Sequence, residues 1–228
     1  MNKSDIGSLF DRIAGSYDGL NHTLSLGIDR SWRRRAVKGM SEADNVLDVA
    51  VGTADLSVEL LHRGKAHRVT GIDLSEKMME IGRKKLSRKG LSDRALLMQA
   101  SALEMPFGDG VFDAVTCAYG VRNFSDLDAG LREMQRVLRS GGELMILEFS
   151  YPSNPIIRFF YDLYFSNIMP FVGRLVSRDK SAYKYLNKSV KGFIWGEEMC
   201  ARLVDAGFSD VTFKPLTFGI STVYRARK

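Results

Sequence analysis

The segment Asn45–Ala54, N-V-L-D-V-A-V-G-T-A, decides the fold of this chain. Its first half is an apolar run typical of a buried strand with Asp48 near the end, and Gly52-Thr53 predicts a tight turn. An apolar-periodic helix follows, and then a second strand that ends at Asp73. This order is typical of a site for adenosine, because glycine lets the backbone approach a ligand and the later acidic residue can accept both ribose hydroxyls.

The glycine pattern of this segment indicates which adenosine ligand fits. Where the dinucleotide pattern G-x-G-x-x-G has glycines, the chain has Ala50, Gly52 and Ala54. A pyrophosphate needs the clearance that glycine leaves, so a ligand without phosphates fits better. We therefore favour S-adenosylmethionine (SAM), with Asp48 near its cationic methionine ammonium. A nucleotide site and a plain structural βαβ unit are the alternatives that the segment leaves open.

The composition indicates one ordinary globular domain. The chain has 228 residues, of which 45% are hydrophobic and 26% are charged. The N-terminus is polar and unlike a signal peptide, and no uncharged apolar run is long enough to span a membrane. The two cysteines offer no disulfide framework and no metal spacing, and Cys117 is expected to be a buried thiol. We expect a cytoplasmic protein without a metal.

The formal net charge of +6 is compatible with a nucleic acid or an anionic membrane surface as partner. Basic residues concentrate at 33–35 and 83–89. The second group lies in the C-terminal half of a predicted helix, where cations favour the helix dipole and face water. The first group follows Trp32, and a contact at an interface stays open for it.

Alternating strands and helices predict the architecture from residue 45 onward. Strands are expected at 45–50, 67–72, 95–99, 113–118 and 143–149, with helices at 54–63, 76–88 and 126–139. This alternation predicts an α/β fold with a mostly parallel Rossmann-like sheet covered on both faces. Two closing strands at 208–213 and 219–226 bring the total to seven and predict an antiparallel hairpin at the sheet edge.

Polar residues indicate where several of these helices begin and end. Ser75 is expected to cap the helix at 76–88, and Ser125 or Asp126 the helix at 126–139. Asp29 or Ser31 is expected to cap a helix through Trp32 and Val37. Gly141-Gly142 is expected to end the helix at 126–139, and Gly207 the helix that starts at Glu197.

We expect a single domain, 1–228, with four parts. Residues 1–42 form an N-terminal helical cap, 43–150 the SAM-binding core, 151–195 a helical insertion after the fifth strand, and 196–228 the C-terminal helix and strands. The insertion is dense in apolar residues between 156 and 172. It is interpreted as core of a cap subdomain, as the wall of a pocket for a large apolar substrate, or as a surface against a membrane or partner.

Small or polar residues follow each of the first five predicted strands. Because ligands bind beyond the carboxyl ends of parallel strands, we expect these residues to share one cleft. They are Gly52-Thr53, Asp73-Leu74-Ser75, Ser101-Ala102, Tyr119–Asn123 and Glu148–Ser150.

Finer motifs carry a resemblance to a known family. They are Phe10–Ala14, Tyr17-Asp18 with Asn21, Leu24–Gly27, Trp32-Arg33, Tyr119–Phe124, Arg136–Leu138, Gly141-Gly142, Glu148–Ser150, and Ser181–Tyr183 with Tyr185-Leu186 and Ser189. From about residue 10 to the C-terminus the chain resembles the menaquinone/ubiquinone biosynthesis C-methyltransferases, which are class I SAM-dependent methyltransferases.

The resemblance implies a set of site residues. Those implied to bind the cofactor are Asp48, Gly52, Thr53, Asp73, Leu74, Ser101 and Ala102. Ser101 stands where the family commonly has an aspartate near the adenine. Arg122 and Asn123 are the implied catalytic residues. Arginine stays protonated at neutral pH, so Arg122 is expected to stabilise a phenolate or hold a relaying water, while Asn123 orients the ring.

The implied reaction is SAM-dependent methylation of a ring carbon of a polyprenylated quinol, foremost demethylmenaquinol to menaquinol. A polyprenyl benzoquinol, another small molecule, and a non-catalytic SAM- or lipid-binding assembly factor are the alternatives. Peripheral contact with the inner face of the cytoplasmic membrane and a homodimer stay open. A nucleic-acid partner is not expected, because Ala118–Val121 stands where amino-group methyltransferases typically have a polar–Pro–Pro–aromatic motif.

Overall fold

The computed structural model describes residues 11, 12, 14, 15, 25, 27–164 and 187–228. These residues form a seven-stranded sheet in the order β3-β2-β1-β4-β5-β7-β6. The strands are β1 (Ala43–Val49), β2 (Ala66–Asp73), β3 (Ala95–Gln99), β4 (Phe112–Ala118), β5 (Leu138–Phe149), β6 (Ser209–Leu216) and β7 (Ser221–Arg227). The first five pair in parallel, and β7 pairs antiparallel with both β5 and β6. The predicted mostly parallel sheet with a terminal hairpin is confirmed.

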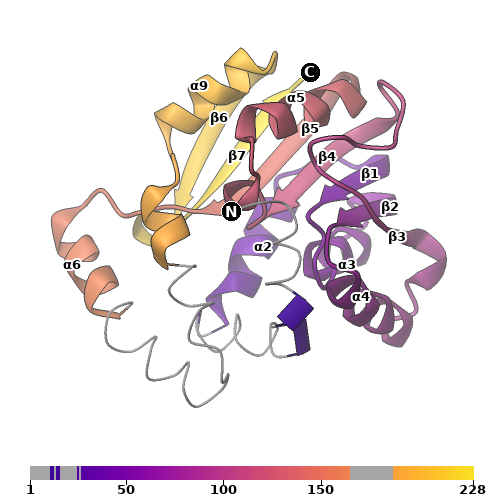
Figure 1. Ribbon diagram of the computed structural model, residues 1–228, viewed down its shortest axis with the longest axis horizontal. Coiled ribbons are helices and arrows are strands. Elements are labelled where there is room, and N and C mark those ends of the chain that lie inside the picture. The colour runs from indigo at the N-terminus through magenta and orange to yellow at the C-terminus, as the bar shows by residue number, and fades with distance from the viewer. Residues whose placement is uncertain (1–10, 13, 16–24, 26, 165–186) are drawn as a thin grey trace.

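Helices cover both faces of the sheet (Figure 1). On one face, α2 (Ile28–Lys38), α3 (Asp55–His62) and α4 (Glu76–Arg88) share a core of buried apolar residues with the strands. On the other face, α5 (Leu127–Val137) and α9 (Glu197–Asp205) pack against a second core. β1 contributes to both cores, since Val46 lies in the first and Leu47 in the second. Cys117 is fully buried in the second core, as predicted.

The fifth strand begins earlier than predicted. β5 starts at Leu138, directly after α5, so Gly141-Gly142 lies inside the strand and does not end the helix. Pairing with neighbouring strands explains this: Leu138 pairs with Phe112 of β4, and Gly141 and Gly142 exchange backbone hydrogen bonds with Lys228 after β7. A register shift between Phe112 and Ala114 accommodates the extra residues.

The helix starts agree with the sequence at two positions and differ at a third. The Ser75 hydroxyl accepts a hydrogen bond from Met78 N, and Asp126 Oδ1 accepts one from Ala129 N. The predicted cap of α2 is wrong: Gly27 is the N-cap, in a left-handed conformation. Asp29 is the second residue of α2 and forms a buried ion pair with Arg33, because the carboxylate and the guanidinium lie four residues apart on one side of the helix.

α2 is fastened to the C-terminal strands, far away in sequence. The Trp32 indole N–H donates to Thr217 Oγ1 at 2.7 Å. At the other end of α2, the Arg225 guanidinium donates to the Ala36 carbonyl and pairs with Glu143. A cation at a helix C-terminus stabilises the free carbonyls. These contacts fix α2 along β5 and β7.

Several sequence interpretations fall outside the described residues. These are most of the N-terminal cap before residue 27, the apolar residues 165–172, and the motif at 181–185. The division of the chain into four parts therefore stays a prediction. No helix in the described part of the chain combines the length and the apolar character that a membrane span needs.

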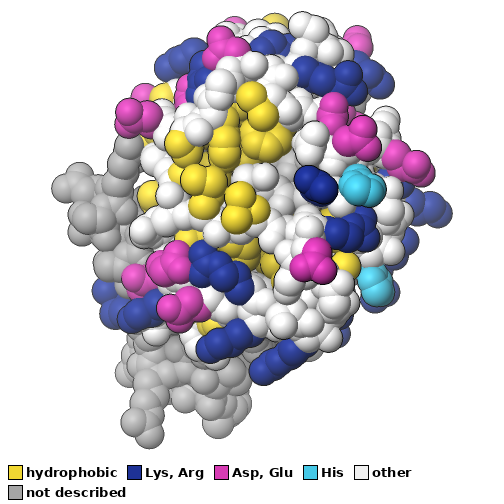
Figure 2. Space-filling model, turned by 90° about the vertical axis from the view of Figure 1, so that its right-hand side faces the viewer, with side chains coloured by type: hydrophobic (Ala, Val, Ile, Leu, Met, Phe, Trp, Pro, Cys, Tyr) yellow, Lys and Arg dark blue, Asp and Glu magenta, His cyan; other side chains and the backbone are white. Residues whose placement is uncertain are grey.

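The charged side chains on the face that carries α3 and α4 are mixed in sign. Figure 2 shows lysine and arginine scattered there among acidic side chains, without a continuous basic stripe. Arg83 pairs with Glu76, and Arg63 with Glu59. A nucleic-acid partner is typically met by a clustered basic surface, so this face offers no such footprint.

Candidate active site

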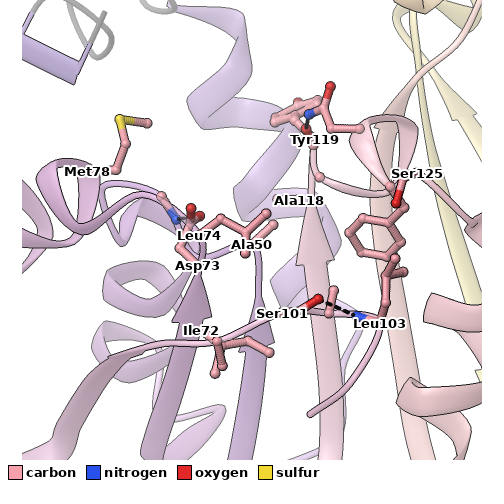
Figure 3. A pocket seen from close by; sticks show the side chains of 16 residues that line it. Ala50, Ile72, Asp73, Leu74, Met78, Ser101, Leu103, Ala118, Tyr119 and Ser125 are labelled. Atoms are coloured by element: carbon pink, nitrogen blue, oxygen red, sulfur yellow. Dashed lines mark hydrogen bonds between the residues drawn. The ribbon is translucent and has the colours of Figure 1, made fainter. Parts of the chain in front are cut away.

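A pocket lies at the carboxyl ends of the parallel strands (Figure 3), and its empty space, counted together with the open solvent at its mouth, is about 790 Å³. It is lined by Ala50, Gly52, Ile72, Asp73, Leu74, Met78, Ala100, Ser101, Ala102, Leu103, Ala118, Tyr119, Gly120, Asn123, Phe124 and Ser125. These residues come from the carboxyl ends of β2 and β4, from the segments that follow β1, β2, β3 and β4, and, for Met78, from α4. Four of the five strand ends predicted to share a cleft therefore do so.

Asp73, at the end of β2, has a fixed carboxylate. Oδ2 accepts the backbone N–H of Gly52 at 2.8 Å, and Oδ1 accepts that of Ser75 at 2.9 Å. Burial raises the pKa of Asp73, and the three backbone N–H groups at Gly52, Leu74 and Ser75 oppose that rise. Asp11, which accepts a hydrogen bond from the Ser75 hydroxyl, raises the pKa of Asp73 further. The carboxylate thus links the glycine turn, the start of α4 and the pocket.

Six of the nine predicted site residues line the pocket, and three do not. Those in the wall are Gly52, Asp73, Leu74, Ser101, Ala102 and Asn123. Asp48, Thr53 and Arg122 lie behind the wall and are held by other protein groups. Met78 of α4 is buried and also lines the pocket.

Asp48 lies beneath the glycine turn. It is buried, and its two oxygens accept hydrogen bonds from Ser57 Oγ at 2.6 Å and Thr116 Oγ1 at 3.2 Å. Burial raises the pKa of Asp48 to about 7, although both hydroxyls favour the charged form. Asp48 therefore joins β1 to α3 and β4 from below and supports the turn that faces the pocket.

Thr53 belongs to a partly buried ionic cluster between α2, α3 and α4. Its hydroxyl accepts a hydrogen bond from Lys85 Nζ at 3.1 Å, and Lys85 also pairs with Asp55. Asp55 pairs in turn with Arg33 Nη2 at 3.3 Å, and Arg33 pairs with Asp29. The basic group at 33–35 is thus split: Arg33 is internal, while Arg34 and Arg35 are exposed.

The Arg122 side chain is turned away from the pocket and into the protein. Its Nη1 pairs with Glu148 Oε1 at 2.7 Å, and the two side chains are only 5% and 1% exposed. Arg122 Nη1 also donates to the Tyr119 carbonyl, and the backbone N–H of Arg122 donates to Glu148 Oε2. Burial raises the pKa of Glu148, and the guanidinium opposes that rise. This pair ties the segment after β4 to the end of β5.

Tyr119 and Gly120 shape the inner wall of the pocket. Tyr119 adopts a left-handed backbone conformation, and its ring stacks on Phe149 at 4.5 Å between centroids. Gly120 has no room for a side chain, because a Cβ would lie 2.6 Å from Ala50 Cβ and 2.7 Å from Cys117 Sγ. The backbone of β1 and β4 therefore meets closely at this point of the wall.

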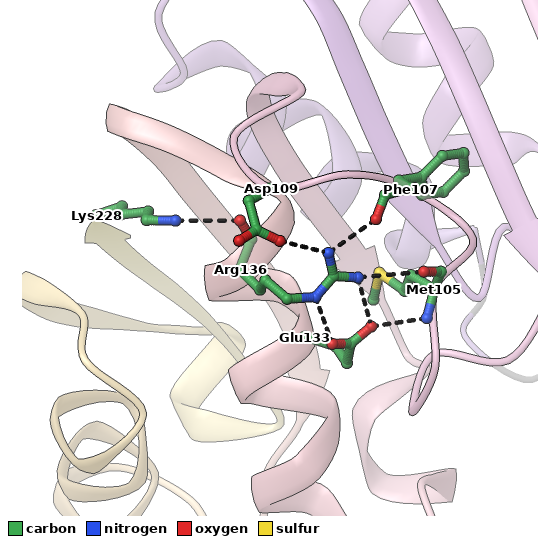
Figure 4. Close-up of polar contacts among 6 residues, drawn as sticks. All are labelled: Met105, Phe107, Asp109, Glu133, Arg136 and Lys228. Carbon is green, nitrogen blue, oxygen red and sulfur yellow. Dashed lines mark hydrogen bonds and ion pairs between the residues drawn. The ribbon is translucent and has the colours of Figure 1, made fainter.

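Arg136 of α5 holds the segment after β3 in place (Figure 4). Its guanidinium binds Glu133 and Asp109 and donates to the carbonyls of Met105 and Phe107. Glu133 Oε2 in turn accepts the backbone N–H of Met105 at 2.7 Å. This cluster lies next to residues 101–103 of the pocket wall, where Ser101 Oγ accepts the N–H of Leu103 (Figure 3).

The sequence missed several wall residues as site residues. They are Ala50, Ile72, Ala100, Leu103, Ala118, Tyr119, Gly120, Phe124 and Ser125. The rule that ligands bind at strand ends had marked Tyr119 and Gly120, and Ala50 lies inside the decisive segment. Phe124 belongs to the motif Tyr119–Phe124 and Ser125 was a candidate helix cap, but neither signal marks a wall residue. Leu103 carries no sequence signal, because only the folding of its loop brings it to the wall.

The wall suits a cationic adenosine ligand without phosphates. Among the described residues that line it there is one carboxylate, Asp73, and no lysine or arginine. Phosphate sites typically use cations or a helix N-terminus, whereas a sulfonium and an ammonium favour a carboxylate. Gly52 has a φ of +53° and leaves the wall open beside Met78. In the described part of the chain, no three His, Cys, Asp or Glu residues gather in a way that could hold a metal.

Known proteins resemble this chain in architecture and in sequence. A SAM-dependent methyltransferase from Thermotoga maritima has a TM-score of 0.68 at 20% identity, covering 98% of this chain and 99% of its own. A Bacteroides fragilis protein named demethylmenaquinone methyltransferase is 45% identical, covering 96% of this chain and 91% of its own. A Geobacter protein named ubiquinone/menaquinone biosynthesis C-methyltransferase UbiE is also 45% identical, covering 98% and 96%. The model of the ubiE/COQ5 methyltransferase family matches residues 1–228, and the chain belongs to that family.

Proposed function

We propose that this protein methylates a ring carbon of a polyprenylated quinol with SAM as methyl donor, and that its acceptor is demethylmenaquinol. The pocket at the strand ends carries this proposal, because it joins a fixed carboxylate, Asp73, to an amide side chain, Asn123, in one wall. Membership of a methyltransferase family supports the reaction type. The relatives named demethylmenaquinone methyltransferase support the naphthoquinol acceptor.

The cofactor half of the pocket is the part between β1, β2 and β3. Asp73 is proposed to accept the ribose hydroxyls, since its carboxylate is held in place by backbone donors on both sides. Gly52 and Leu74 contribute backbone to the same part, and Ser101 and Ala102 line the end where the adenine is proposed to lie. Asp48 and Thr53 are proposed to act from behind, by fixing the turn that carries Gly52.

When bound, SAM supplies an electrophilic methyl group on a sulfonium. The chain must place the acceptor carbon in line with that methyl group and help the quinol ring to carry negative charge. Asn123 is proposed to orient the ring, because its side chain belongs to the wall next to Tyr119 and Gly120. The largely apolar wall strengthens each polar contact that it makes.

Arg122 is proposed to act on this step through the segment that it holds. Its guanidinium pairs with Glu148 and with the Tyr119 carbonyl, which fixes the backbone between Tyr119 and Asn123. The direct role predicted from the sequence, stabilising a phenolate, requires the guanidinium to leave Glu148. Comparing Arg122→Lys with Glu148→Gln separates the two roles. Positioning predicts that both variants lose kcat, whereas a direct role predicts that Glu148→Gln keeps it.

The substrate is tested with the purified chain, SAM and two reduced acceptors. Demethylmenaquinol and a demethylated polyprenyl benzoquinol are incubated separately, and mass spectrometry counts added methyl groups. The proposal predicts one methyl group on the naphthoquinol. Methylation of the benzoquinol alone would reassign the acceptor. No product from either, with intact SAM binding, would favour another small-molecule substrate or an assembly factor.

The place of action follows from the chemistry of this acceptor. A polyprenyl tail resides in a lipid bilayer, so we propose that the protein works in the cytoplasm at the inner face of the cytoplasmic membrane. A homodimer is compatible with this proposal, and light scattering of the purified chain measures it.

A further inference from the structure

Helix α6 (Pro155–Leu163) presents an apolar stripe to solvent. Ile156, Phe159, Phe160 and Leu163 are 67%, 64%, 59% and 47% exposed. Their spacing of three, four and seven residues places them on one side of the helix. Four large apolar side chains on one short helix form an unusual surface for a soluble domain, because exposed apolar residues are normally scattered singly.

The opposite side of α6 is fastened to the body of the protein by Tyr151. The Tyr151 hydroxyl donates to Asp162 Oδ2 at 2.6 Å, and the Tyr151 ring packs edge-on against Tyr161 at 5.5 Å. Arg158 and Lys191 lie over the Tyr151 ring, and Lys191 also pairs with Asp162 at 2.7 Å. These contacts fix the rotation of α6 and keep its apolar stripe pointing outward.

Phe218 is a fifth exposed apolar side chain, on a turn that contacts the chain leading into α6. It lies in the turn between β6 and β7, is 77% exposed, and has a left-handed backbone conformation with a φ of 57°. Such a conformation is uncommon for a bulky residue. The turn contacts the chain that leads into α6, since Ser150 Oγ donates to the Gly219 carbonyl at 2.8 Å and Ser150 N to the Ile220 carbonyl at 3.0 Å.

We propose that the α6 surface, defined as the stripe Ile156, Phe159, Phe160 and Leu163 together with Phe218, docks the protein onto an anionic lipid bilayer. Aromatic and aliphatic side chains on one helix face insert into the region between headgroups and acyl chains. α6 follows β5, and the carboxyl end of β5 lies at the same end of the sheet as the strand ends that line the pocket. Docking there brings the pocket to the polyprenyl substrate, and in this respect the inference rests on the proposed function.

The net charge of α6 and its neighbouring segments favours anionic lipid over a second copy of the chain, although Arg158 and Lys191 lie on the side of α6 opposite the apolar stripe. The described residues 151–163 and 187–195 carry three cations, Arg158, Lys188 and Lys191, and one carboxylate, Asp162. This leaves an excess of two positive charges, which anionic headgroups attract. A two-fold symmetric dimer through the same surface would bring two such positive regions together.

Vesicle flotation tests the docking directly. The full chain is mixed with vesicles of phosphatidylcholine alone, or of phosphatidylcholine with phosphatidylglycerol. We expect the chain to float with the anionic vesicles, and the double variant Phe159→Ser/Phe160→Ser to bind them at least tenfold more weakly. Val204→Ser is the matched control, because Val204 of α9 is a similarly exposed apolar residue, 57% exposed, outside the α6 surface. Equal flotation of all three proteins, or none with wild type, would overturn the inference.

Two further measurements separate this inference from the proposed function. With demethylmenaquinol carried in anionic vesicles, the double variant is expected to turn over at least tenfold more slowly than wild type, and at an equal rate with a short-tailed soluble acceptor. If wild type methylates neither acceptor, the proposed function fails while flotation still tests docking. A wild-type dimer that the double variant dissociates, without vesicle binding, would assign the α6 surface to a second copy.

Discussion

The buried ion pair between Arg122 and Glu148 is predicted to be a strongly coupled structural element. Both side chains are almost fully excluded from water, and their charged atoms lie 2.7 Å apart. Removing one partner leaves an uncompensated buried charge, which costs about 3–5 kcal/mol. Because the free energy of unfolding of a domain is about 5–15 kcal/mol, Arg122→Met or Glu148→Gln alone should remove a large share of it.

The double variant Arg122→Met/Glu148→Gln should be less costly than either single variant, because it leaves no buried charge without a partner. Urea unfolding followed by circular dichroism measures all four proteins as a double-mutant cycle. Arg139→Met is the control. Arg139 pairs with Asp113 at the same distance of 2.7 Å, but its side chain is 59% exposed, so its loss should cost about 1 kcal/mol or less. The reasoning would be refuted if the two single variants lowered the free energy of unfolding additively, or if each lowered it as little as Arg139→Met does.

Three further variants test the site. Asp73→Asn should weaken SAM binding about 10- to 100-fold in calorimetry, because hydrogen bonds to a charged group contribute about 1.5–3 kcal/mol, and an unchanged Kd would exclude Asp73 from the ribose site. Ser101→Asp should tighten SAM about tenfold, by adding an acceptor for the adenine amino group, and a weaker Kd would show that the bond to Leu103 N matters more. Asp48→Asn should flatten the pH dependence of stability. Burial raises the pKa of Asp48 to about 7, so folded wild type keeps a proton that the unfolded chain releases near pH 4. As the pH rises from 4 to 7, the free energy of unfolding of wild type should therefore fall relative to that of the variant. Free energies from urea unfolding that follow the pH in parallel in the two proteins would contradict a titrating, buried Asp48.

The order of strands and helices could be predicted because each element carries a strong local signal. The helix at 76–88 has a serine cap and a clear apolar period, and the structure confirms both ends. The start of β5 was harder to predict, because its first residues include Gly141-Gly142, and two adjacent glycines usually mark a turn. Their pairing with Lys228, at the other end of the chain, decides that they belong to a strand. Such long-range pairing leaves no local signal.

The site was predicted best where function depends on backbone position. Gly52, Asp73 and Ser101 lie at strand ends, and the topology alone brings those ends together. The direction in which a side chain points is a different matter. Arg122 follows β4 as expected, yet its guanidinium turns inward because Glu148, fully buried at the end of β5, requires a cation. The sequence shows both residues but does not show that they meet.

Transfer of an isotopically labelled methyl group tests the central claim most directly. The full chain is incubated with SAM whose methyl group carries deuterium and with demethylmenaquinol, and the quinol product is analysed by mass spectrometry and by NMR. The account predicts that one intact labelled methyl group appears on a ring carbon, and that Asp73→Asn slows its appearance at limiting SAM. A label on a quinol oxygen, or an unlabelled quinol despite measurable SAM binding, would contradict it.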